Sequence, residues 1–172
     1  MSRFKNSVIL IWSAALILLL VTADLFTKEL ACHHLKGNAS VKLIDGVLEF
    51  LYVENRGAAF SMLENARWFF IIVAAAAAVC IIILLIRMPI SRHFIPLRLS
   101  LLFIFAGAVG NLIDRITLSY VRDFIYFSLI DFPVFNVADM YVTCATAILI
   151  VLVLFYYKDE DFLWIKKTKV SI

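Results

Sequence analysis

The sequence WFFIIVAAAAAVCIIILLI, residues 68–86, decides the fold class of this chain, because no charge interrupts it between Arg67 and Arg87. A helix needs about 20 apolar residues to cross the hydrocarbon core of a bilayer. The composition agrees, since hydrophobic residues make up 64% of the 172 residues and charged residues only 17%. The chain is therefore predicted to be an integral membrane protein with a single domain, residues 1–172.

Similar apolar stretches lie on both sides of this segment. The predicted spans are about residues 8–28, 68–86, 95–115 and 139–157, joined by the outer segments 29–67 and 116–138. The third has a short apolar centre, Leu99 to Ile113, so Asn111, Asp114 or both are expected within membrane depth. The predicted fold class is an all-α membrane protein with four transmembrane helices.

Basic residues predict the orientation of these spans. They lie at the N-terminus, between the second and third spans, and in the C-terminal tail, and they include Arg3, Lys5, Arg87, Arg92, Arg98, Lys158, Lys166, Lys167 and Lys169. The positive-inside rule places both termini in the cytoplasm and both outer segments on the opposite face. The net charge of +3 is small, and topology explains the basic residues better than nucleic-acid binding does. The first span is expected to be a retained anchor, since Asp24 and Lys28 fall where a signal peptide would be cleaved.

The outer segments carry signals for a small sheet. Two β-prone runs, 41–44 and 47–53, flank the turn sequence Asp45-Gly46 and predict a hairpin. The later stretch YVRDFIYFSLIDFPVF, residues 120–135, is unusually apolar for a connection. It is expected to lie in the membrane interface, with one piece pairing with the hairpin.

Four aspartates, Asp24, Asp114, Asp123 and Asp139, are predicted to share one layer near the outer face. A carboxylate at the bilayer centre costs about 2.5–3.5 kcal/mol on insertion scales, so several together indicate a function. Two close carboxylates that share one proton can activate water. The ionised member takes a proton from water, and the protonated member polarises a carbonyl. The spacing of the four aspartates does not show which two of them form such a pair.

Structural interpretations remain open beside this one. Asp24 and Lys28 are four residues apart on a helix and can neutralise each other. Arg115 can pair with Asp114 or another acid, or reach lipid headgroups. Polar residues including Asn111 and Asn136 can hold helices together.

Other residues give weaker signals. Glu54 and Asp131 are expected to be solvated, and the adjacent His33 and His34 lack further ligands at metal spacing. Ser61 has no nearby general base. Small residues at 74–78 and at Gly107 and Gly110 predict close helix packing. The competing functional classes are an ion-coupled carrier, which would place acids at the midplane or show inverted repeats, and a non-catalytic scaffold.

Five motifs together decide between these classes. They are Asp24-x-x-x-Lys28, Asn55-Arg-Gly57-Ala-Ala-Phe-Ser, Gly110-Asn111-Leu-Ile-Asp114-Arg115, Val121-Arg-Asp123-Phe, and Phe-Asn136-Val-Ala-Asp139. In order and spacing, from the first span to the last, the chain resembles the lipoprotein signal peptidases, also called signal peptidase II. Residue 25 is Leu where the family more often has Gln.

The resemblance implies an aspartic-type endopeptidase of the bacterial cytoplasmic (inner) membrane. Such an enzyme removes signal peptides from diacylglyceryl-modified prolipoproteins by cleaving on the amino side of the lipidated cysteine, near the outer face. It implies Asp123 and Asp139 as the catalytic pair, no metal or cofactor, and contact with membrane lipids and globomycin-type inhibitors. The positions that it implies for substrate binding or support are Asn55, Gly57, Asn111, Asp114, Arg115, Asn136, Asp24 and Lys28. It also implies a β-cradle and a short interfacial helix on the outer side.

Overall fold

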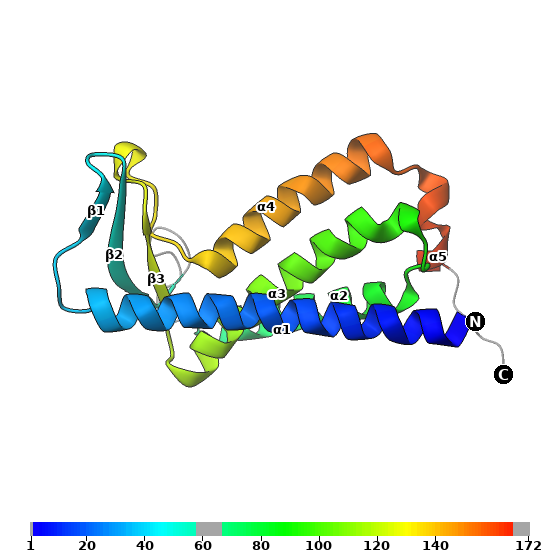
Figure 1. Ribbon diagram of the computed structural model, residues 1–172, viewed down its shortest axis with the longest axis horizontal. Helices are drawn as coiled ribbons and strands as arrows, with labels where there is room; N and C mark the ends of the chain where they lie inside the picture. Colours follow the sequence, from blue (N-terminus) through cyan, green and yellow to red (C-terminus); the bar gives the residue numbers. More distant parts are fainter. Residues whose placement is uncertain (1, 58–66, 167–172) are drawn as a thin grey trace.

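The computed structural model describes residues 2–57 and 67–166. Its long helices are α1 (Ser2–Leu35), α2 (Arg67–Arg87), α3 (Ile95–Thr117) and α4 (Val137–Val151). In the described part of the chain, segments 7–35, 67–87, 92–117 and 137–156 are long and apolar enough to cross a membrane. Figure 1 shows a small sheet at one end of the helices, and the start of α1 and residues 163–166 at the other. The predicted fold class is confirmed.

Helix α3 lies at the centre of the bundle and contacts α1, α2 and α4. Two glycines make these contacts close. A Cβ on Gly107 would lie 2.5 Å from the carbonyl oxygen of Ala138 and 2.8 Å from a methyl group of Val142, both on α4. A Cβ on Gly110 would collide with the carboxylate of Asp24 on α1. The predicted role of these glycines in close helix packing is confirmed.

The sheet consists of three antiparallel strands in the order β1 (Val41–Ile44), β2 (Leu48–Asn55) and β3 (Val121–Tyr126). Gly46, with φ of 69°, provides the left-handed turn between β1 and β2. The hairpin is therefore confirmed, and so is its pairing with the later outer segment. In the β2–β3 register Val53 lies opposite Asp123, so the end of β2 lies beside Asp123.

The sheet rests on the end of α1. Ala31 and Leu35 of α1 are buried together with Phe124 of β3, and Phe50 and Tyr52 of β2 pack against them. Burial against the sheet explains why α1 continues past Lys28 to Leu35. A short 3-10 turn, η3 (Ser128–Ile130), follows β3. Of the predicted small-residue segment after Asn55, residues 58–61 lie outside the described part of the chain.

The opposite end closes with short elements and aromatic contacts. Helix α4 continues into a wider turn, η4 (Leu152–Tyr156), followed by η5 (Asp159–Phe162) and α5 (Leu163–Lys166). Tyr157 stacks on Phe94 of η2 (Arg92–Phe94) with ring centroids 5.8 Å apart. The Tyr157 hydroxyl donates to the carbonyl of His93 at 2.9 Å. These contacts tie the C-terminal segment to the start of α3.

The tight α3–α4 contact gives a first prediction. Gly107→Val should destabilise the protein by about 1–3 kcal/mol, because overpacking forces backbone or side-chain shifts. The measurement is thermal unfolding in detergent. Ala77→Val, on an exposed face of α2, adds two methyl groups without a facing helix and serves as the control. Equal melting temperatures for the two variants would contradict the close contact.

Candidate functional site

The predicted pair of Asp24 and Lys28 forms on α1, and neither side chain is exposed to solvent. The Lys28 ammonium lies 2.8 Å from Oδ2 of Asp24. The other Asp24 oxygen accepts the backbone N–H of Ala138 at 2.9 Å. Since Ala138 is in the first turn of α4, the pair does more than neutralise charge within one helix. It joins α1 to the start of α4, and Gly110 of α3 leaves the space for it.

Lys28 also reaches α3. Its ammonium donates to Oδ1 of Asn111 at 2.9 Å and lies 3.7 Å from Oδ2 of Asp114. A buried ammonium has three donors to satisfy and is costly without partners. Asp24 and Asn111 accept its hydrogen bonds, and the Asp114 carboxylate adds negative charge at ion-pair distance. The expected polar network between helices is therefore present.

Asn111 connects this network to Asp139 on α4. Its Nδ2 donates to Oδ1 of Asp139 at 2.7 Å. The other Asp139 oxygen accepts the backbone N–H of Asn136 at 3.1 Å, and the Asn136 side chain accepts the backbone N–H of Asp139 at 3.0 Å. This reciprocal pair is a capping box at the start of α4. The capping box therefore fixes the Asp139 side chain at the N-terminus of α4.

Asp123 lies on β3 and is almost fully buried, with 2% of its surface exposed. Asn55 on β2 donates to its Oδ2 at 2.8 Å, and Asn136 donates to its Oδ1 at 2.6 Å. Burial and the nearby Asp139 charge raise the pKa of Asp123 to about 7, although the two asparagines and Lys28 oppose the rise. Gly57 contributes its backbone N–H, which donates to Oδ1 of Asn55 at 3.0 Å. Asp123 thus lies in the piece of the outer segment 120–135 that pairs with the hairpin.

Asn136 brings the two carboxylates into one network. Its side chain donates to Asp123 and also to Oδ1 of Asn111 at 3.2 Å, while its backbone holds Asp139. Asn136 is completely buried. A single residue at the start of α4 therefore fixes the strand carboxylate and the helix carboxylate relative to each other.

Arg122 is the site residue that sequence reasoning missed. Its guanidinium donates to both oxygens of Asp114, at 2.8 and 3.2 Å, and its backbone N–H donates to the same carboxylate at 3.1 Å. It also donates to Glu29 on α1 at 2.8 Å. The available signal was an arginine inside an apolar, strand-forming segment, directly before Asp123.

Arg115 does not pair with Asp114, because Arg122 holds that acid. Among the described residues, Arg115 has its guanidinium carbon 5.1 Å from the centroid of the Phe70 ring and makes no hydrogen bond or ion pair. It lies near enough for its charge to interact with Asp139 and Asp123. A half-buried guanidinium beside two carboxylates, with its donors unused by the described residues, can bind a peptide carbonyl.

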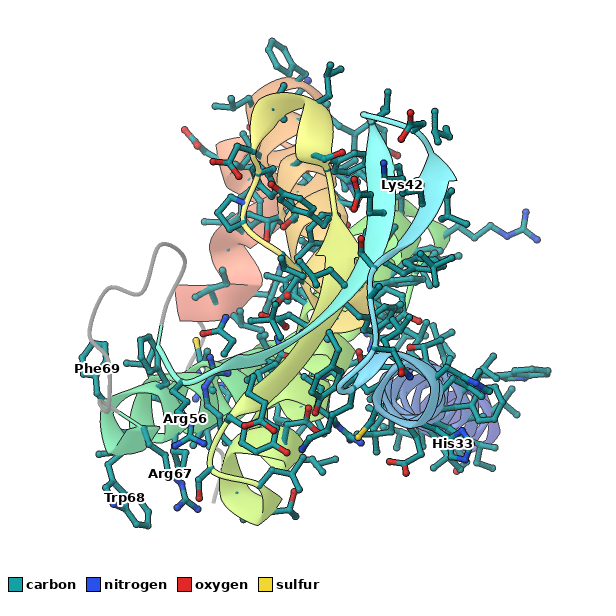
Figure 2. The ribbon with its side chains drawn as sticks, turned by 90° about the vertical axis from the view of Figure 1, so that its left-hand side faces the viewer. His33, Lys42, Arg56, Arg67, Trp68 and Phe69 are labelled. Carbon is teal, nitrogen blue, oxygen red and sulfur yellow. The ribbon has the colours of Figure 1, made fainter. Side chains whose placement is uncertain are left out.

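The remaining candidates lie apart from this network. Asp131 is exposed and accepts a hydrogen bond from Tyr126 at 2.7 Å, and Glu54 pairs with Lys36 at 2.8 Å. Figure 2 looks onto the sheet end and shows Arg56 and Arg67 on the side opposite His33. Within residues 2–57 and 67–166, no three His, Cys, Asp or Glu side chains gather as metal ligands would.

The fold and site define a multi-pass membrane protein with a buried network of acids and amides at one end of its helices. Two solved structures, each described as a bacterial membrane enzyme, share this fold. One has a TM-score of 0.75 and 26% identity and covers 93% of both chains. The other has a TM-score of 0.74 and 28% identity and covers 84% of this chain and 94% of its own.

Sequence comparison gives the family. Residues 16–155 match the family described as Signal peptidase (SPase) II. The lipoprotein signal peptidase of Streptococcus thermophilus (strain CNRZ 1066) is 37% identical over 145 residues, which is 84% of this chain and 92% of the relative. The lipoprotein signal peptidase of Brevibacillus brevis is 40% identical over 139 residues, or 81% and 92%. The chain therefore belongs to the signal peptidase II family of membrane peptidases.

The central position of Lys28 gives a second prediction. Lys28→Met should destabilise the protein by about 3–5 kcal/mol, because Asp24 would remain buried without its cation. Thermal unfolding in detergent measures the loss. Lys36→Met removes a partly exposed pair with Glu54 and should have little effect, since solvent screens that pair. Similar losses of stability in the two variants would contradict the central role of Lys28 in the buried network.

Proposed function

We propose that this protein is an aspartic endopeptidase that removes signal peptides from diacylglyceryl-modified prolipoproteins, cleaving on the amino side of the lipidated cysteine. Asp123 and Asp139 form the catalytic pair in this proposal. The observation that carries it is the placement of both carboxylates on one asparagine, Asn136, with different surroundings for each. The curated relatives named lipoprotein signal peptidase support the substrate class.

The surroundings assign the two roles. Asp139 sits at the N-terminus of α4 and accepts hydrogen bonds from Asn111 and the Asn136 backbone, and we assign it the role of the base. Asp123 is buried in the sheet, and its raised pKa of about 7 favours a protonated carboxyl at lower pH. Asp139 would take a proton from water as the water attacks, while Asp123 would donate a hydrogen bond to the scissile carbonyl. Protein side chains alone perform this chemistry, and the proposal includes no metal or cofactor.

The supporting residues have separate tasks. Asn55, Asn111 and Asn136 orient the carboxylates, and Gly57 orients Asn55. Lys28 holds Asn111, together with Asp24 and Asp114. Arg115, which makes no hydrogen bond within the described residues, would bind the backbone of the peptide and hold it for attack. The same contact would receive peptide inhibitors of the globomycin type.

The proposed orientation matches this substrate. Both termini and the connection between α2 and α3 would face the cytoplasm, because the basic residues gather there. The sheet and the carboxylates would lie near the outer face of the bacterial inner membrane. A signal peptide anchored in the bilayer presents its cleavage site at that depth, with its lipid tails among membrane lipids. Residues 1–172 would act as one domain.

Removal of either carboxylate tests the catalytic pair. Asp123→Asn and Asp139→Asn should each lower kcat at least 1000-fold, because neither amide can exchange the required proton. The assay is cleavage of a diacylglyceryl prolipoprotein peptide by purified protein. Asp131→Asn, an exposed acid, should retain wild-type activity. Substantial cleavage by Asp123→Asn or Asp139→Asn would contradict the assignment of the catalytic pair. Failure of the wild-type protein to cleave any lipidated substrate would favour a carrier or a scaffold.

The pKa of Asp123 gives a pH prediction. Below pH 7 Asp123 is protonated and can donate its hydrogen bond. Above pH 7 Asp123 ionises and the hydrogen-bond donor is lost. The value of kcat/KM, which reports the free enzyme, should therefore fall about tenfold per pH unit above neutrality. Single-turnover assays from pH 5 to 9 measure it. A profile that stays flat to pH 9 would exclude Asp123 as the proton donor.

A further inference from the structure

Arg122 makes several charged contacts, and none of the catalytic roles assigned above uses it. Its side chain is only 11% exposed, and three of its N–H groups, one from the backbone, donate to Asp114. Its remaining contact, Glu29, is 73% exposed. The buried part of the interaction is therefore with Asp114, and the contact with Glu29 faces solvent.

The charges of Asp24 and Asp114 are balanced only when Arg122 is counted. Asp24 and Asp114 are both fully buried, and each lies within 4 Å of the single Lys28 ammonium. Arg122 supplies the second cation, so two carboxylates face two cations. Without Arg122, Lys28 is the one cation within ion-pair distance of Asp114 among the described residues. An uncompensated buried charge is costly, so Lys28 would be drawn toward Asp114.

A displaced Lys28 would disturb the catalytic pair. Its ammonium now lies 2.9 Å from Asn111 and 3.7 Å from Asp114. Movement toward Asp114 weakens its hold on Asn111, whose Nδ2 positions Asp139. The same loss frees β3 at the residue directly before Asp123, because the Arg122 guanidinium no longer joins the strand to Asp114 on α3. Both carboxylates thus depend on one cation that contacts neither.

We infer that Arg122 is a positioning residue for the proposed peptidase reaction: by neutralising Asp114 it keeps Lys28 on Asn111 and holds Asp139 and Asp123 in their working arrangement. The inference rests on the proposed function. The groups that act on the charge of Asp123 are the charged Asp139, Lys28 and Arg115 and the hydrogen-bonding Asn55 and Asn136.

The kinetic test compares Arg122→Gln, Arg122→Lys and Glu29→Gln on a lipidated prolipoprotein peptide. Arg122→Gln should lower kcat about 10- to 100-fold with KM within about twofold, as small misplacement of catalytic groups does. The pH above which kcat/KM falls should be higher in this variant than in the wild-type protein, because the catalytic pair loses positive charge nearby. Arg122→Lys keeps the charge and should restore most of both properties. Glu29→Gln removes only the solvent-facing contact and should match the wild-type protein.

Two results would overturn the inference while the peptidase proposal stands. One is a wild-type kcat in Arg122→Gln. The other is a reduced kcat with an unchanged pH profile and no recovery in Arg122→Lys, which indicates loss of packing alone. If the wild-type protein cleaves nothing, the peptidase proposal fails, and titration of ¹³C-labelled aspartate carboxyls in detergent decides the inference. A higher Asp123 midpoint in Arg122→Gln than in the wild-type protein supports it, and an equal midpoint overturns it.

Discussion

The buried ammonium of Lys28 is the constraint on which the polar interior of this protein depends. A lone cation in an apolar bundle is costly, and its charge and donors must all be satisfied nearby. Asp24 and Asn111 accept hydrogen bonds from it, and Asp114 adds a second carboxylate at 3.7 Å, from α1 and α3. Because Asp24 also accepts the backbone N–H of Ala138, the same arrangement fixes where α4 begins. Gly110 follows from this geometry, since any side chain there would occupy the place of the Asp24 carboxylate.

Near the start of α4, two carboxylates lie in different surroundings. Asp139 lies in a capping box at a helix N-terminus, where negative charge is favoured. Asp123 lies in a buried strand, where burial raises its pKa. Acid–base chemistry at neutral pH requires two carboxylates in different environments, so that one can give a proton and the other can take one. The asymmetry comes from the fold itself, because one acid is carried by a helix end and the other by a sheet.

Much of this arrangement could be predicted from the sequence, and the rest required three dimensions. Apolar length gave the four helices, the Asp45-Gly46 turn gave the hairpin, and helical spacing gave the pair of Asp24 and Lys28. The partner of Asp114 could not be found in this way. Arg115 is adjacent in sequence, but adjacent helical residues point in different directions, and it faces Phe70. Arg122 reaches Asp114 only because β3 folds back beside the end of α3, which no local pattern specifies.

The length of α1 shows how the sheet and the bundle act together. Its 34 residues extend about 51 Å, whereas a hydrocarbon core is about 30 Å thick. The additional turns bury Ala31 and Leu35 against the sheet, and Glu29 meets Arg122 of β3. One rigid helix thus carries Lys28, which organises α3 and α4, and the surface that supports the strand of Asp123. Asn136 joins the two carboxylates directly, and α1 supports both of the elements that carry them. Changes at Ala31 or Leu35, which pack against the sheet, are therefore transmitted to the strand of Asp123 although neither residue touches the aspartate.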